Sequence, residues 1–280
     1  IPIAQHIGAP STPVVKKKDT VKVGDVIAQS QGFVSTNIHS SVSGTVAKID
    51  QVIDTSGFRK PCVVIQVEGD EWADGIDTSP DLIKDFSLSG EEIRQKVLDS
   101  GVVGMGGATF PSHVKLSIPE GKKVDTLIIN GVECEPYLTS DHRVMLERGE
   151  EMLVGVKLLM KALGVDRAMI GVESNKPDAI RQLNELVNGE DGIEVYALKV
   201  KYPQGGEKQL IKALLNREVP SGGLPLDVGA VVHNVGTALA VYEAVQKNKP
   251  LVERVISVTG KSLKKPVNLQ VRIGTPVKDL

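Results

Sequence analysis

Aromatic side chains and net charge are both scarce in this chain. Its 280 residues include one tryptophan, four tyrosines and four phenylalanines, and its formal net charge at pH 7 is −2. Proteins that bind nucleic acid usually present a basic face, often with aromatic side chains on which bases stack. The composition therefore gives no case for a nucleic-acid partner. The length suits two domains, or one large domain with an appendage.

Cysteines and long apolar runs are also lacking. Cys62 and Cys134 are the only cysteines, and they lie far apart without a C-x-x-C motif. Neither a disulfide framework nor an iron–sulfur site can be built from this pair, so we expect a reducing, cytoplasmic setting. No apolar run approaches the roughly 18 residues that a membrane-spanning helix needs, and the first ten residues do not resemble a signal peptide. A start at Ile1 rather than methionine suggests a trimmed chain.

Glycine, in contrast, is concentrated in the stretch Gly101–Lys115, which reads GVVGMGGATFPSHVK and has four glycines within seven residues. Such a loop lets a ligand approach the backbone, and Pro111 favours a helix start, where N–H groups and the helix dipole attract phosphate. Lys115 could add a full positive charge. The stretch is neither the dinucleotide fingerprint, because Thr109 replaces the third glycine, nor a P-loop. An anion site and a glycine-rich loop without a ligand both remain open.

The first 70 residues predict a small barrel-like β-sandwich, and a polar linker over residues 71–88 follows it. Related modules carry a lipoyl or biotinyl lysine at a hairpin tip, but Ser40–Ser43 occupy the expected tip here, so we interpret the module as structural. His6 and His39 could be metal ligands, although isolated histidines on such a module are more often polar surface groups. The β-branched runs that predict its strands are Val21–Ile27, Phe33–Ile38, Val42–Ile49 and Cys62–Val67.

Residues 89–248 predict an α/β domain, because strand and helix patterns alternate there, which is typical of a largely parallel sheet. Ser89 and Glu92 form a capping box that starts the first helix, over Ile93 and Val97. The expected strands are Val124–Asn130, Arg167–Val172, Ile193–Val200 and Val228–Asn234. The expected helices are Glu150–Leu163, Pro177–Val187, Glu207–Leu215 and Gly236–Val245. Residues 249–280, with strands at Val255–Thr259 and Val267–Val271, predict the start of a small β-grasp module.

Three loops of the predicted α/β domain combine glycine or asparagine with polar groups. They are Asn130–Pro136, Tyr202–Glu207 and His233–Thr237, and each follows a predicted strand. Ligands in open α/β sheets bind at the carboxyl ends of strands, so these loops and the glycine stretch together favour a ligand site. The alternative is that Gly205–Glu207 and Gly236–Thr237 only begin helices.

Four motifs in this order resemble the C subunit of the Rnf electron-transport complex and, more distantly, the flavoprotein subunit of respiratory complex I. They are the glycine stretch, N-G-V-E-C-E-P, Y-P-Q-G-G-E-K and N-V-G-T. P-I-A-Q-H-I-G-A-P and S-G-T-V resemble the lead module of the Rnf subunit, so the resemblance covers essentially the whole chain. It implies a Rossmann-like domain with FMN across the carboxyl ends of the strands and NAD(H) stacked on its face. No catalytic acid or base is expected, because the hydride chemistry belongs to the cofactor.

The resemblance also implies which residues bind, by position in the motifs. Those expected at FMN are Gly104, Gly106, Gly107, Lys115, Asn130, Glu133, Asn234 and Thr237. Those expected at NADH and the flavin face are Phe110, Glu135, Tyr202, Gly205 and Glu207. The chain departs from the complex I relatives where Met105, Leu116, Val132 and Gly206 replace arginine, tryptophan, aspartate and glutamate, which removes charge and stacking area around the expected flavin.

As an Rnf subunit, the chain would exchange hydride between NAD(H) and FMN and pass electrons to 4Fe-4S clusters. The complete complex would couple ferredoxin oxidation and NAD reduction to ion pumping, with the chain held at the cytoplasmic face of the membrane by other Rnf subunits. The family continues into a domain with two 4Fe-4S clusters whose cysteines this chain lacks, so we expect a chain truncated before that domain. Two alternatives are a cobalamin-reducing flavoprotein of a microcompartment and a docking scaffold without cofactor.

Overall fold

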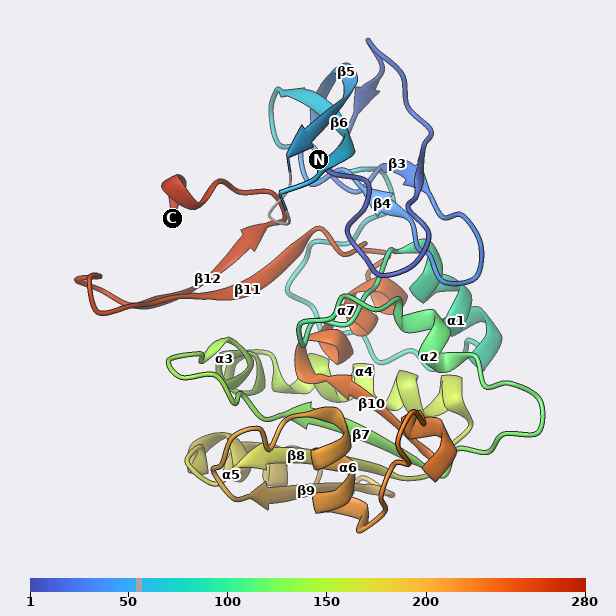
Figure 1. The fold of residues 1–280 in the computed structure, drawn as a ribbon, viewed down its shortest axis with the longest axis vertical. Helices are drawn as coiled ribbons and strands as arrows, with labels where there is room; N and C mark the ends of the chain where they lie inside the picture. Colours follow the sequence, from blue (N-terminus) through green and yellow to red (C-terminus); the bar gives the residue numbers. More distant parts are fainter. Residues whose placement is uncertain (54–56) are drawn as a thin grey trace.

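A computed structural model describes residues 1–53 and 57–280. Figure 1 shows an N-terminal β-module above a layered α/β domain, with a long β-hairpin projecting between them. In the part of the chain that the structure describes, no helix is both long and apolar enough to cross a membrane.

Two small antiparallel sheets form the N-terminal module, around a core that includes Ile3, Ile27, Val46 and Val63. The first sheet has the order β1 (Thr12–Pro13), β3 (Val26–Gln29), β4 (Ile38–His39), and the second has the order β2 (Thr20–Val21), β5 (Gly44–Ile53), β6 (Arg59–Val67).

Two strand predictions for this module were wrong. The run Val21–Ile27 is divided by a turn at Gly24, where φ is +96°. Only Ile38 of the run Phe33–Ile38 is in a strand, and Phe33 is exposed. A run rich in β-branched residues can therefore form an irregular segment in a short module, and its composition alone does not distinguish that segment from a strand.

The expected hairpin tip and His39 are also not at the surface. Ser40, Ser41 and Ser43 are buried, and the Ser41 hydroxyl donates to the carbonyl oxygen of Ile273, 2.7 Å away. His39 is buried as well, and burial lowers the pKa of its imidazole to about 4. The interpretation of His39 as a surface polar group was therefore wrong. His6 lies with its Nε2 atom 3.2 Å from the Ser11 hydroxyl.

The α/β domain contains a four-stranded, entirely parallel sheet, as predicted. Its strand order is β10 (Ala230–Asn234), β7 (Thr126–Gly131), β8 (Ala168–Glu173), β9 (Ile193–Leu198). The predicted strands agree with the observed ones to within two residues at each end. The chain proceeds from β7 to β8 and β9 on one side and returns to the other side for β10. This reversal creates a switch point between β7 and β10, where the connections leave in opposite directions.

Helices cover both faces of this sheet (Figure 1). On one face pack α1 (Gly90–Asp99), α4 (Gly149–Leu163), α5 (Pro177–Leu186) and α7 (Val235–Gln246), and on the other lie α6 (Glu207–Leu215) and the 3-10 helix η1 (Pro225–Val228). The capping box of α1 is confirmed, with reciprocal hydrogen bonds between Ser89 and Glu92. The short helices α2 (Ser112–Leu116) and α3 (Ser140–Glu147) lie near the strand ends, and α3 was not predicted.

The C-terminal hairpin is fastened to both parts of the molecule. It consists of β11 (Glu253–Val258) and β12 (Val267–Arg272), followed by the 3-10 helix η2 (Val277–Asp279). The ring of Trp72, in the linker, is contacted by the charged groups of Lys249 and Arg272, at 5.6 and 4.5 Å from its centroid. Arg272 also donates to Glu253 at 2.7 Å and to the carbonyl oxygen of Ser41 at 3.0 Å.

Helices α4 and α7 approach each other closely at Gly155. A methyl group at this position would overlap the backbone carbonyl oxygen of Ala238 on α7. Backbone cannot move aside as a flexible side chain can, so the absence of a side chain at Gly155 sets the separation of the two helices. The start of α7 at the switch point depends on this packing.

We expect Gly155→Ala to destabilise the domain by about 1–3 kcal/mol, the usual cost of overpacking, despite the gain of about 1 kcal/mol in helix propensity. Gly149→Ala, at the start of the same helix, is the matched control. Its methyl group would meet only the ends of the flexible side chains of Leu186 and Gln182, at 2.9 and 3.4 Å. Urea unfolding of both variants gives the measurement, and equal effects would contradict the close-packing explanation.

Candidate functional site

A cavity of about 610 Å³ opens at the carboxyl ends of β7 and β10. Its size is within the range of small-molecule sites, about 300–1,000 Å³. The glycine stretch, the three predicted loops, the first turns of α3 and α7, and the hairpin all contribute to it. Its lining includes Met105, Gly106, Gly107, Asn130, Glu133, Glu135, Asp141, Tyr202, Gly205, Asn234, Gly236 and Arg254. The three loops and the glycine stretch therefore meet, as predicted.

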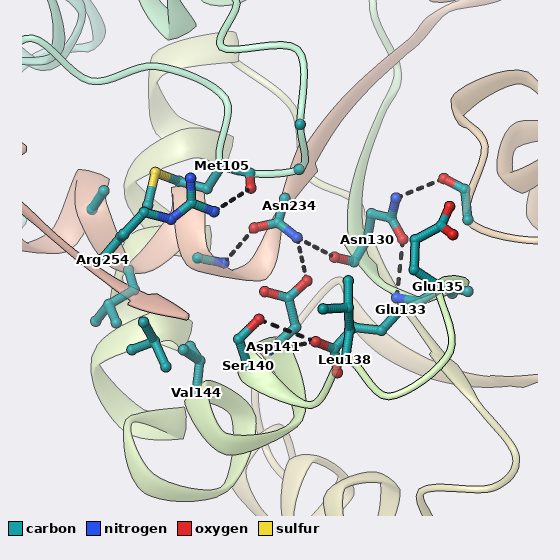
Figure 2. A pocket seen from close by; sticks show the side chains of 18 of the residues that line it. Met105, Asn130, Glu133, Glu135, Leu138, Ser140, Asp141, Val144, Asn234 and Arg254 are labelled. Atoms are coloured by element: carbon teal, nitrogen blue, oxygen red, sulfur yellow. Dashed lines mark hydrogen bonds between the residues drawn. The ribbon is translucent and has the colours of Figure 1, made fainter. Parts of the chain in front are cut away.

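Two asparagines mark the switch point itself. Asn234 ends β10, Asn130 is the second-to-last residue of β7, and the two are register partners in the parallel pairing. The Asn234 amide donates to Asp141 at 2.6 Å, and its oxygen accepts from the backbone N–H of Gly236 at 2.8 Å (Figure 2). The Asn130 amide donates to the carbonyl oxygen of Gly205 at 2.9 Å. Both side chains are held in fixed orientations at the base of the cavity.

The glycine stretch forms one wall. Its position is set by the backbone N–H of Met105, which donates to the Thr237 hydroxyl at 2.9 Å. A methyl group at Gly106 would lie 3.4 Å from the Asn234 side chain, and Gly107, with φ +126°, has no atom of the described residues within 4 Å of the position a Cβ would take. Backbone is thus presented directly to the cavity. The predicted passage from this loop into a helix is confirmed, with Pro111 as the residue before α2.

Glu133 caps α3 with its side chain. The carboxylate accepts from the backbone N–H groups of Asp141 and His142, at 2.9 and 3.1 Å, and from the Ser140 hydroxyl at 3.2 Å. The Lys176 ammonium lies 3.9 Å away. Glu133 lines the cavity, yet its oxygens are engaged in holding the start of α3.

Asp141 is a lining carboxyl group whose pKa is strongly raised. Its carboxyl group is enclosed at the start of α3, and this burial, followed by the negative charge of Glu133, raises its pKa from 3.8 to about 7. The hydrogen bond from Asn234 and the positive charges of Arg254 and Lys176 oppose that rise. Asp141 therefore changes charge near neutral pH.

Lys115 and Glu207 bind each other. The Lys115 ammonium lies 2.7 Å from the Glu207 carboxylate and also donates to the carbonyl oxygen of Val232 at 3.0 Å. Neither side chain lines the cavity, nor do Gly104, Phe110 and Thr237, which lie behind its wall. The structure thus places the lysine predicted for phosphate and the glutamate predicted for NADH in one ion pair.

His233 is a buried neighbour of this ion pair. Burial, with the adjacent charge of Lys115, lowers its pKa to about 3, so the ring is neutral near pH 7. Among the described residues, no group of three or more histidine, cysteine, aspartate or glutamate side chains is arranged to hold a metal ion.

The predicted NADH residues divide between the rim and the interior. Glu135 and Tyr202 are exposed at the mouth of the cavity. Gly205 lies beside Cys134, and its backbone N–H donates to the Cys134 sulfur.

Asp141 and Arg254 line the cavity but were not predicted from the sequence. Asp141 lies five residues after the end of the N-G-V-E-C-E-P motif, so its closeness to the motif could have indicated it. No motif near Arg254 in the sequence indicates that this residue lines the cavity.

Two family models match the chain. The model described as the Nuo51 FMN-binding domain matches residues 97–243, and the model described as the RnfC barrel sandwich hybrid domain matches residues 1–70. The first of these contains the glycine stretch and all three cavity loops.

Curated relatives cover the whole chain. The C subunit of the proton-translocating ferredoxin:NAD(+) oxidoreductase complex of Clostridium ljungdahlii is 50% identical over 280 residues, which span 60% of its own length. The C subunit of the Na(+)-translocating ferredoxin:NAD(+) oxidoreductase complex of Acetobacterium woodii is 47% identical, with 63% of its length covered. The chain therefore spans somewhat less than two thirds of these relatives. They support neither the cobalamin-reducing alternative nor the scaffold.

A solved structure has the same fold. An NAD+-reducing NiFe-hydrogenase in the H2-reduced state matches with a TM-score of 0.59 and 23% identity, covering 68% of this chain and 38% of the hydrogenase chain. The likeness to this structure is one of fold alone, and the family models carry the assignment. The chain belongs to the Nuo51 FMN-binding domain family, in the branch that includes the C subunits of the Rnf-type ion-translocating oxidoreductases.

Proposed function

We propose that this chain binds FMN and NAD(H) in the switch-point cavity and exchanges hydride between them. The observation that carries the proposal is the cavity between β7 and β10, where Asn130, Asn234 and the glycine wall meet. An open α/β sheet offers a ligand its carboxyl-end crevice at such a reversal of strand order.

The residues present fit FMN. Gly106 and Gly107 give a flat group access to backbone, and the two asparagine amides provide polar atoms in fixed orientations. The start of α7, at Asn234 and Gly236, adds the positive end of a helix dipole, which favours a phosphate. FMN would supply the hydride chemistry, and the protein would supply position and charge. Gly104, Glu133 and Thr237 would act indirectly, by holding the loop and α3.

NAD(H) would enter at the mouth of the cavity. Glu135 and Tyr202 are exposed there, and Gly205 leaves the inner surface without a side chain. Tyr202 offers an aromatic face and Glu135 a hydrogen-bond acceptor. Phe110 lies outside the lining, so we assign it a supporting part in the glycine wall.

The wider setting follows from the relatives' names. We infer that the chain works as part of an Rnf-type complex, with other Rnf subunits as partners and with membrane association, at the cytoplasmic face, through them. Electrons would pass between FMN and ferredoxin by way of 4Fe-4S clusters in the portion of the relatives that this chain does not span. We divide the chain into a β-module (1–70), a linker (71–88), the FMN/NADH domain (89–248) and the start of a β-grasp module (249–280).

The Lys115–Glu207 pair suggests how two parts of the site could be coupled. A phosphate near α2 would compete with Glu207 for the Lys115 ammonium, which would release the carboxylate toward the NADH side. FMN binding would then prepare the site for NADH. In this proposal, Lys115 remains the partner of the FMN phosphate and Glu207 remains at the NADH side.

The first test is a titration of FMN into the purified chain, followed by anaerobic addition of NADH. We expect saturable quenching of flavin fluorescence and then bleaching of the flavin absorbance, because hydride transfer reduces the ring. Binding without bleaching would contradict the NADH part of the proposal. Absence of binding would contradict the FMN part.

Removal of the Lys115 charge should weaken FMN. We expect Lys115→Ala to cost about 1.5–3 kcal/mol in FMN affinity, the scale of a hydrogen bond to a charged group. Glu207→Ala should retain FMN, because Lys115 is then free for the phosphate, while the KM for NADH rises. Lys122→Ala, an exposed lysine paired with Asp227, is the control. Unchanged FMN affinity in Lys115→Ala, or flavin loss in Glu207→Ala, would contradict the assignment.

The stability of the chain without ligand should depend on pH through Asp141. Because folding raises its pKa from 3.8 to about 7, the stability that its protonated form provides is complete below pH 4 and is lost as the pH rises through 7. Relative to wild type, the Asp141→Asn variant should therefore gain unfolding free energy between pH 4 and 7 and level off above it. Urea unfolding at several pH values measures this, and parallel curves for the two proteins would disprove it.

A further inference from the structure

Positive charge is scarce in the cavity. Its lining contains five carboxylates, against only two cationic side chains, Arg148 and Arg254. Arg148 is engaged, since it forms ion pairs with Glu151 and Glu243. Arg148 is therefore not available to an anionic ligand in this cavity.

Arg254 is the cationic lining residue that is free to serve. In the described ranges, 1–53 and 57–280, no carboxylate lies within 4.0 Å of its guanidinium. Its only hydrogen bond among these residues is one of 3.5 Å from Nη2 to the carbonyl oxygen of Met105. That bond is long, so the planar group retains most of its five donors for another acceptor.

The location of Arg254 is set by the hairpin. It is the second residue of β11, which brings its guanidinium over the glycine wall beside Met105, and Figure 2 shows the side chain reaching toward this wall. Its charge also acts within the cavity, because it opposes the rise in the pKa of Asp141. The adjacent Glu253 holds the strand in place through Lys249 and Arg272.

A second feature points to an anion at the same place. Helix α7 is twelve residues long and begins at the base of the cavity, with Gly236 in its first turn. The Met105–Gly107 segment lies between this helix start and Arg254, and its glycines leave the backbone open. Lys115 lies outside the lining and would have to leave Glu207 to reach a phosphate, whereas Arg254 has no carboxylate to leave among the described residues.

We propose that Arg254 binds a phosphate group of the ligand in this cavity. The inference rests on the proposed function, because that function supplies the phosphate, either the monoester of FMN or the diphosphate of the nicotinamide dinucleotide. A guanidinium can bind phosphate oxygens through two parallel hydrogen bonds, which a lysine cannot. The hairpin would thus take part in ligand binding as well as in joining the two parts of the molecule.

The test compares ligands with and without phosphate. FMN and riboflavin are titrated by fluorescence quenching, and ADP-ribose by calorimetry, into wild type, Arg254→Gln, Arg254→Lys and the control Arg181→Gln. Arg181 is exposed on α5, outside the cavity, so its loss reproduces the change in net charge.

If Arg254 binds the flavin phosphate, Arg254→Gln lowers FMN affinity about ten- to a hundredfold while riboflavin affinity stays within about twofold, and Arg254→Lys falls between. If it binds the dinucleotide, ADP-ribose affinity drops instead and FMN is unaffected. Equal loss of FMN and riboflavin, or no change with any ligand, overturns the inference. If the wild-type protein binds neither FMN nor riboflavin, the proposed function is refuted. The ADP-ribose titration then decides on Arg254 alone, and an absence of ADP-ribose binding to wild type also overturns the inference.

Discussion

The parallel register of β7 with β10 is the constraint on which the cavity depends. It sets Asn130 opposite Asn234 at the strand ends, and each asparagine then fixes a different loop through its amide. A slip of either strand by one residue would turn its asparagine to the other face of the sheet and separate the pair. The close approach of α4 to α7 at Gly155 supports the same arrangement from behind, because it holds the helix that starts at Asn234. Glycine and asparagine thus act together, one by removing bulk and the other by adding oriented polar atoms.

Much of this framework can be predicted from the sequence. Alternating strand and helix patterns gave four strands and four helices of the α/β domain nearly to the residue, because long periodic segments carry a strong local signal. The rule for carboxyl strand ends then brought the three loops together. The N-terminal module was harder to predict, since its two-residue strands are set by packing between sheets, and His39 is buried where a surface position was expected.

What could not be predicted depends on contacts between distant residues. Helix α3 was not predicted because its N-terminus is capped by the side chain of Glu133, across a loop, and not by the residue that precedes the helix. The Lys115–Glu207 pair joins residues 92 positions apart, so two residues expected at different ligands meet each other. Arg254 lies near the glycine wall because strand β11 of the hairpin places it beside Met105. Each of these contacts forms only in the folded chain, so local sequence patterns do not predict it.

The contacts of Trp72 with Lys249 and Arg272 have a spectroscopic consequence. This residue is the sole tryptophan of the chain, and its ring contacts Lys249, which follows α7, and Arg272 of the hairpin. The ultraviolet emission of the protein therefore originates at the joint between its parts and not in the hydrophobic core of the α/β domain. Undocking of the hairpin would alter the colour and intensity of this emission while the helical circular dichroism stays the same. The molecule carries its own optical reporter of that joint.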